Sequence, residues 1–213
     1  NPGGTGAFSV WCDFASDDVP WTVFQHRTPS TSDVNFFRRW DDYQTGFGSP
    51  AAFSGPGYQK DAKDAAGSYW LGLDKVYRLV SMSTLRLRID MCDGGDPTVD
   101  SADCRTAMYS TFSIGTGADK YRLNVGGYSD GVFRYESGKE TSKSPGDSLS
   151  YHSGNKFSTH DQDNDHWSSH CAQSVHGAWW YHSCHYSNLN GGYGKTGYAN
   201  GLSWYHWVGY YNP

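Results

Sequence analysis

The sequence changes character near residue 148. Before this point, short segments alternate between apolar and polar side chains, at residues 8–14, 21–27, 84–91, 107–114 and 120–128. Such alternation is typical of strands that bury one face in an antiparallel sheet. After residue 148 the alternation fades, and Gly, Asn, Trp, Tyr and His dominate. Because a segment with so little regular structure needs cross-links or bound ions to hold it, the pattern predicts a strand-rich first half and a loop-rich second half.

Two segments carry helix signals. The stretch "SDVNFFRRWDDYQTGFG" offers Ser32 or Asp33 as an N-cap and Gly46 as a stop. Residues 73–81, "LDKVYRLVS", offer Asp74 as a second cap. Short helices beside antiparallel strands place the sequence in the α+β class.

Composition excludes several classes of protein. The 17 basic and 22 acidic residues give a net charge of −5, and no cluster of Lys and Arg indicates nucleic-acid binding. No apolar run approaches the ~18 residues of a membrane span, and no basic-then-apolar leader is present, so we expect a mature chain without membrane insertion. Aromatic residues make up 16% of the sequence, which argues against disorder.

Four of the five cysteines form two close pairs. Cys92 and Cys104 make the first pair, Cys171 and Cys184 the second, and each pair brackets a polar loop. Local disulfides are the first interpretation, and they imply an oxidising compartment. A zinc site is the alternative, although neither pair has the CxxC spacing common in such sites. Cys12 is left without a partner in the sequence.

An aspartate run lies within "FSTHDQDNDHWSSHC". Asp161, Asp163 and Asp165 alternate, and such carboxylates can converge on one hard cation. An EF-hand is excluded, because the sixth position counted from Asp161 is His166 rather than Gly and the twelfth is Ala172 rather than Glu. The two interpretations left are a calcium site completed by backbone carbonyls and a solvated acidic turn.

The second half shows no motif typical of an enzyme. Eight of the nine histidines lie between residues 152 and 206, with no HExxH pair among them. We expect most of these histidines to be exposed or structural. No nucleophile motif or recognisable pair of catalytic carboxylates is present. The aromatic runs "GAWWYHSC" and "GKTGYANGLSWYHW" fit either a core of rings or a shallow apolar pocket for a small ligand.

Long motifs resemble one known family. The segments "WTVFQHR", "FFRRWDDYQTGFG", "YWLGLDKVYRL", "GDSLSYHSGNKFSTHDQDNDHW", "CAQSVHGAWWYHSCHYSNLNGGY" and "GLSWYHW" occur in the order seen in fibrinogen C-terminal domains. The resemblance implies one domain over residues 1–213, with a central twisted antiparallel sheet, short helices and a loop-rich calcium-binding subdomain. Its parts would be a remnant of an N-terminal subdomain (1–15), a sheet subdomain (16–118) and a calcium- and ligand-binding subdomain (119–213).

The resemblance also implies a calcium site. The cation would be held by the carboxylates of Asp163 and Asp165 and by the carbonyls of Trp167 and Ser169. In this family a disulfide that corresponds to Cys171–Cys184 lies beside the cation.

In many members of the family the peptide bond before the second cysteine of that disulfide is cis, which implies a cis bond between Ser183 and Cys184. In the lectin-like members, a pocket next to the calcium takes an N-acetyl group. The corresponding ligand-binding residues are His185, Tyr198, Ala199, Val175, Ser183, Cys184 and Trp180.

Some positions depart from the family pattern. Val175 replaces a tyrosine that often lines the pocket. A fibrin-type role is disfavoured, because Val175 and Ala199 stand where the fibrinogen γ pocket has acidic residues for a cationic peptide. Residues 49–67 form a longer link than usual, and Cys12 matches a family cysteine whose partner lies upstream.

The first functional hypothesis is a secreted, calcium-dependent lectin that binds acetylated glycans on microbial or host surfaces in innate immunity. The second is a protein-interaction module, of the receptor-ligand or matrix type, in which calcium is only structural. An enzyme has no supporting motif. The sequence leaves open a homo-oligomer formed through Cys12 or through direct contacts between domains.

Overall fold

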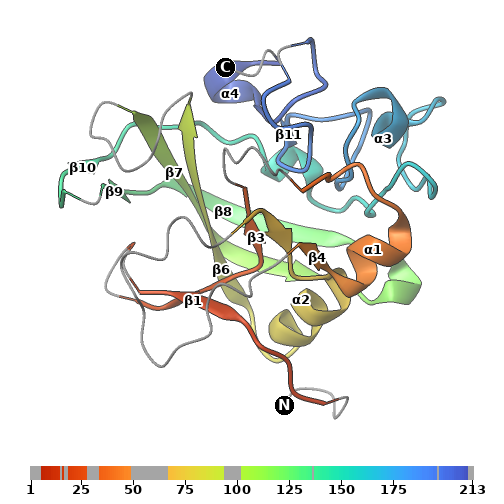
Figure 1. Ribbon diagram of the computed structural model, residues 1–213, viewed down its shortest axis with the longest axis horizontal. Helices are drawn as coiled ribbons and strands as arrows, with labels where there is room; N and C mark the ends of the chain where they lie inside the picture. The colour runs from red at the N-terminus through yellow and green to blue at the C-terminus, as the bar shows by residue number, and fades with distance from the viewer. Residues whose placement is uncertain are drawn as a thin grey trace.

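A three-stranded antiparallel sheet crosses the centre of the molecule (Figure 1). Its order is β6-β7-β8, in which β6 spans Leu85–Asp93, β7 spans Asp103–Ile114 and β8 spans Leu123–Asp130. The computed structural model describes residues 6–14, 16, 19–27, 34–48, 67–93, 102–135, 137–195 and 197–210. The predicted strands 84–91 and 107–114 correspond to β6 and β7.

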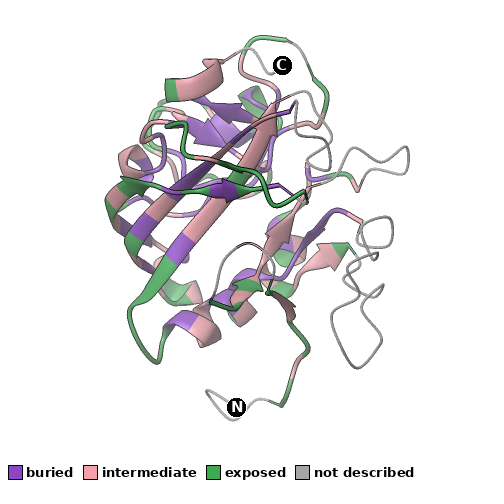
Figure 2. Ribbon diagram, turned by 90° about the vertical axis from the view of Figure 1, so that its left-hand side faces the viewer, coloured by how far each residue is buried: buried purple, intermediate pink, exposed green. Residues whose placement is uncertain are grey.

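Strand β7 is central because it pairs with β6 on one side and with β8 on the other. Ala107, Tyr109, Phe112 and Ile114 are all at most 4% exposed, and buried and partly exposed bands alternate along the long strands (Figure 2). Its register with β6 sets Cys92 opposite Cys104, and these cysteines form a disulfide. The disulfide predicted for this pair is therefore confirmed.

Smaller sheets surround this centre. The predicted strand 8–14 is present only as β1, and the predicted strand 21–27 is divided between two sheets as β2 and β3. The pairs are β1 (Trp11–Asp13) with β2 (Trp21–Val23), β9 (Phe133–Arg134) with β10 (Glu140–Thr141), and β11 (Ser187–Asn188) with β12 (Ser203–Trp204). A further sheet has the order β3 (Gln25–His26), β5 (Tyr69–Trp70), β4 (Phe47–Gly48).

The helices are short. They are α1 (Trp40–Thr45), α2 (Leu73–Val80), α3 (Cys171–Ser174) and α4 (Tyr205–Val208), with 3₁₀ turns at Gly117–Asp119 and Ser150–His152. Helices α1 and α2 lie close together near one end of the sheet (Figure 1). Helix α2 buries Leu73, Val76 and Val80 at helical spacing. Within the described residues no helix is both long and apolar enough to cross a membrane.

The predicted caps are corrected by the structure. Helix α1 starts only at Trp40, after Arg39, and the predicted caps Ser32 and Asp33 lie outside the described residues. The predicted stop at Gly46 is confirmed. Gly46 has a φ of 101°, and a Cβ there would lie 2.4 Å from the carbonyl oxygen of Leu71, so glycine is required.

Asp74 does not cap α2. Gly72 precedes the helix, and Asp74 lies in its first turn, where its carboxylate accepts a hydrogen bond from the Tyr121 hydroxyl. Near this contact, the predicted start of a strand is also wrong. The strand predicted from residue 120 begins at Leu123, because Lys120 and Tyr121 have positive φ values of 54° and 50° that interrupt an extended backbone.

One hydrophobic core joins both halves of the protein. Tyr43 and Trp70 from the first half share it with Phe157, Trp180 and Trp204 from the second. The predicted divisions after residues 15 and 118 stay a prediction, and β8 lies in the same sheet as β7 although it follows residue 118. Aromatic rings from the loop-rich half therefore supply much of the buried surface.

Candidate functional site

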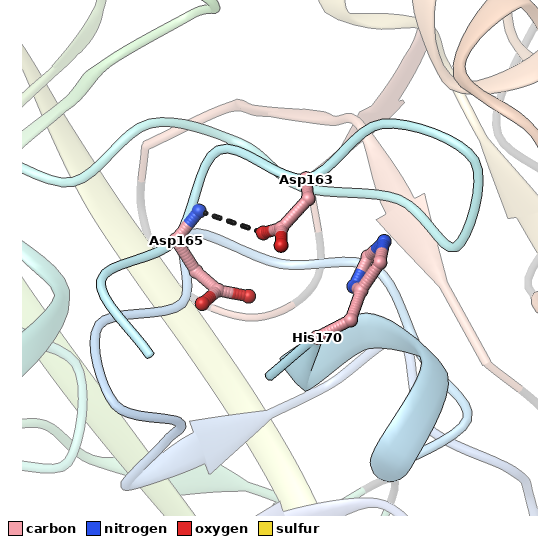
Figure 3. A group of neighbouring side chains, drawn as sticks. All are labelled: Asp163, Asp165 and His170. Carbon is pink, nitrogen blue, oxygen red and sulfur yellow. Dashed lines mark hydrogen bonds between the residues drawn. The ribbon is translucent and has the colours of Figure 1, made fainter. Parts of the chain in front are cut away.

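The acidic run bends back on itself in front of α3. Asp163, Asp165 and His170 each place one potential ligand atom within 4.8 Å of the others (Figure 3). Backbone N–H groups fix the loop: that of Asp165 donates to Asp163 Oδ1 at 3.2 Å, and that of Trp167 donates to Asp165 Oδ1 at 2.9 Å. The structure thus brings the two predicted calcium carboxylates together.

Asp161 has a different role from the other two aspartates. Its Oδ1 accepts from the backbone N–H of Trp40 at 3.0 Å and from Thr159 Oγ1 at 2.8 Å, and its Oδ2 lies 3.3 Å from Arg39 Nε. It therefore ties the loop to the start of α1. The even spacing of the three aspartates does not indicate that Asp161 has a structural role whereas Asp163 and Asp165 form the candidate cation site.

The negative charges of Asp163 and Asp165 favour binding of a cation between them. Within the described residues, neither Asp163 nor Asp165 forms an ion pair with a lysine or arginine. Burial raises the pKa of Asp165; the N–H donors of Trp167 and Cys171 oppose this rise, and the negative charge of Asp163 adds to it. A bound divalent ion would relieve the repulsion between the two carboxylates.

The carbonyls of Trp167 and Ser169 are the other predicted ligands. Both residues are exposed, and neither carbonyl accepts a hydrogen bond within the described part of the protein. Carboxylates, and carbonyls that accept no described hydrogen bond, are oxygen ligands of the kind that calcium takes. The ligand set stays a prediction, and the structure adds His170, which sequence reasoning missed. The signal that could have found His170 is its position directly before Cys171.

A disulfide connects the acidic loop to a pocket. Cys171 begins α3 and is bonded to Cys184, which confirms the predicted pairing. The peptide bond between Ser183 and Cys184 is cis, as the family resemblance implied. The N–H of Cys171 also donates to Asp165 Oδ2 at 2.9 Å. One residue therefore contacts the acidic loop and is linked covalently to the pocket wall.

The pocket is a cavity of about 360 Å³. It brings together six of the seven residues predicted to bind the ligand, and it adds five that sequence reasoning missed. Its lining consists of Val175, Ser183, Cys184, His185, Tyr198 and Ala199, together with Tyr151, Trp167, Ser174, Tyr186 and Tyr210. Among the described residues, no Asp, Glu, Lys or Arg belongs to this lining, so the pocket suits an uncharged ligand.

Trp180 is the predicted ligand-binding residue that the pocket does not include. Its side chain is 2% exposed, its Nε1–H donates to the Tyr121 carbonyl at 2.7 Å, and its ring packs 5.0 Å from that of Phe157. Trp167, which is 42% exposed, lines the pocket instead. Within the aromatic runs, Trp179 and Trp180 are buried in the core, whereas Tyr198 belongs to the pocket lining. That this pocket takes a ligand stays a prediction.

His185 is the most unusual polar group in the pocket. It is 5% exposed, and both ring nitrogens are buried without a hydrogen-bond partner among the described residues. Burial lowers the pKa of His185 to about 4, so the ring is neutral at physiological pH. A buried polar ring without partners normally has one supplied by water or a ligand.

The backbone around the pocket is held by local contacts. Tyr210 donates its hydroxyl to the His185 carbonyl at 3.0 Å, and its carbonyl accepts the N–H of Ala199 at 2.8 Å. Ala199 has a positive φ of 59°, which turns the backbone beside Tyr198. The ring of Tyr198 is 64% exposed at the rim, whereas Val175 is 7% exposed. Away from this site, Cys12 has a free thiol.

Comparison with known proteins extends these observations. The family model for the C-terminal globular domain of the fibrinogen beta and gamma chains matches residues 2–212. Human tenascin-R is 38% identical over 201 residues, which cover 94% of this chain but 12% of that protein. This chain thus corresponds to a small part of tenascin-R.

Solved structures agree in fold. The fibrinogen-like globe domain of human ANGPTL6 has a TM-score of 0.76 at 35% identity, covering 98% of this chain and 81% of that one. The lamprey fibrin D-dimer, solved with the peptide Gly-His-Arg-Pro-amide, has a TM-score of 0.70 at 29% identity, covering 95% and 61% of the two chains.

Proposed function

This chain belongs to the family of fibrinogen C-terminal globular domains, and from that premise we propose that it is a calcium-supported recognition module for N-acetyl groups of glycans. The observation that carries the proposal is His185, a neutral buried ring with no described partner, which faces an uncharged pocket lined by tyrosines. An acetyl group offers a methyl for the rings and an oxygen for a polar donor. The protein would act outside the cell, on microbial or host surfaces.

The calcium ion would stabilise the pocket from one side. Asp163 and Asp165 would supply carboxylates, and the carbonyls of Trp167 and Ser169 would complete the shell. The N–H of Cys171 donates to Asp165, and Cys171 is bonded to Cys184 in the pocket wall. A calcium ion that fixes the acidic loop would therefore also fix the pocket wall.

Calcium titration tests this part. Calorimetry on the oxidised protein should give a Kd on the order of 10⁻⁴ M or tighter. Asp163→Asn should weaken binding at least about tenfold, because it removes a charged oxygen ligand. Asp161→Asn is the matched control in the same loop, and its calcium affinity should match the unsubstituted protein. Equal affinity of all three proteins would contradict the assignment.

Binding of N-acetylglucosamine tests the pocket. The expected Kd is roughly millimolar, since so few ligand atoms can contribute. Tyr198→Ala should weaken binding about tenfold, and the exposed ring leaves little reason for unfolding. Phe14→Ala removes an exposed aromatic ring outside the pocket lining and should have no effect. Binding to glucose as strong as to its N-acetyl derivative would contradict the proposal.

A protein partner is the second candidate. Similarity to tenascin-R and ANGPTL6 motivates it, and the exposed ring of Tyr205 (43%), outside the pocket lining, suits a protein contact. A cationic peptide like the one bound to lamprey fibrin is disfavoured, because the pocket residues that the structure describes offer it no carboxylate. Partner binding that survives Tyr198→Ala and calcium removal would favour this candidate.

A further inference from the structure

The cation cluster contains a nitrogen donor. Calcium takes oxygen ligands, whereas imidazole suits zinc, copper and nickel. Asp163 and Asp165 provide oxygen, but His170 provides a ring nitrogen within 4.8 Å of the chosen carboxylate oxygens. The ring is turned toward the two carboxylates from the start of α3 (Figure 3). A calcium site with open backbone carbonyls does not need this side chain.

The backbone that carries His170 is well fixed. Its carbonyl accepts the N–H of Ser174 and the Ser174 hydroxyl, both at 3.0 Å. Cys171, its neighbour, is held by the disulfide to Cys184. The Nδ1 atom of His170 is itself buried and has no hydrogen-bond partner among the described residues. Its ring is thus presented from a rigid position with unused donor or acceptor capacity.

We propose that Asp163, Asp165 and His170 form a site for a zinc-class transition-metal ion, which competes there with calcium. The inference shares two carboxylates with the proposed calcium site, but it depends on His170, which that site does not use. Three protein ligands are typical of a zinc site that leaves one position open for water or another donor.

The distances allow this once the side chains rotate. Ligands about 2.0–2.2 Å from a tetrahedral zinc ion lie roughly 3.4 Å apart. The ligand atoms lie within 4.8 Å of one another, so the closure needed is at most about 1.4 Å, which rotation of the side chains can supply. Calcium, at about 2.3–2.6 Å from its ligands, needs less closure. The same loop can therefore accept a larger oxygen-bound ion or a smaller one with nitrogen.

Direct titration of the oxidised, metal-free protein tests the proposal. Zinc binding is measured by calorimetry, and cobalt(II) reports nitrogen ligation in its visible absorption. His170→Asn should weaken zinc and cobalt binding at least about tenfold, the scale on which even outer-shell partners alter metal affinity. Calcium affinity should change less than about threefold. Added calcium should displace zinc from the unsubstituted protein.

Two comparisons make the outcome decisive. His176→Asn is the matched control, an exposed histidine outside the cluster, and it should leave zinc affinity unchanged. Thermal melting confirms that each variant is folded. Equal zinc binding by the unsubstituted protein and His170→Asn overturns the proposal, as does calcium binding without any competition from zinc. Failure of the proposed function would look different: N-acetylglucosamine would not bind, whatever the zinc titration gave.

Discussion

Trp180→Ala is expected to lower the free energy of unfolding by roughly 3–5 kcal/mol, because it removes a large ring from a packed core. The indole is 2% exposed, its N–H donates to the Tyr121 carbonyl, and it contacts the rings of Phe157 and Trp179 at 5.0 and 5.1 Å. The Tyr121 hydroxyl donates a hydrogen bond to Asp74 of α2. The substitution would therefore also weaken the packing between Tyr121 and the first half of the protein. Urea unfolding of the oxidised protein, with calcium present throughout, measures the difference.

Trp167→Ala is the matched control. Trp167 is 42% exposed and lines the pocket, so its loss should change stability by no more than about 0.5 kcal/mol while weakening ligand binding. Near-equal stability of the two variants would show that Trp180 is not a core residue. The pair of variants thus distinguishes a tryptophan of the core from a tryptophan of the pocket lining, which sequence alone could not do.

The sequence predicted the parts of the fold that depend on local pattern. Alternation located β6 and β7, and the positive φ of Gly46 explains why a glycine marked the end of α1. The predicted element boundaries are wrong where a contact with a residue distant in the sequence determines the local backbone conformation. The alternating pattern places Tyr121 in a strand, but its hydroxyl donates a hydrogen bond to Asp74, 47 residues away, and its φ of 50° interrupts the extended backbone. Such contacts leave no periodic signal.

The same limit applies to the candidate site. The family motifs led to Asp163, Asp165 and His185, since these residues lie within the long matching segments. They did not lead to His170 or Tyr210. His170 joins the cluster because the loop folds back in front of α3, and Tyr210 reaches the His185 carbonyl from 25 residues further along the sequence. Convergence of this kind depends on the whole fold, so residues that share a site need not share a motif.

His152 should make the protein sensitive to acid. It is fully buried, Nδ1–H donates to the Trp180 carbonyl at 2.7 Å, and Nε2 accepts the N–H groups of Tyr186 and Ser187 at 3.1 and 3.0 Å. A proton on Nε2 would break both of these latter bonds. Burial accordingly lowers the pKa of His152 to about 3 in the folded state, against the usual value of 6.5.

The sign of the effect follows from proton linkage. Below pH 6.5 the unfolded protein binds a proton at this residue that the folded protein does not, so acid favours unfolding until the pH approaches the folded value of about 3. Stability at pH 4.5 should be roughly 2–3 kcal/mol below that at pH 7 from this group alone. His185 acts in the same direction, because burial lowers its pKa to about 4. Urea unfolding between pH 7 and pH 4.5 measures the slope.

His152→Asn isolates the contribution of one ring. The variant should be less stable at pH 7, because it cannot make all three hydrogen bonds, yet it should lose less stability on acidification because one titrating group is gone. His176→Asn removes an exposed ring and should leave the pH dependence as it was. A slope in His152→Asn as steep as in the unsubstituted protein would mean that the acid sensitivity arises elsewhere. Because His152 bonds the backbone of Tyr186, a pocket residue next to His185, acid that opens this contact should also weaken ligand binding.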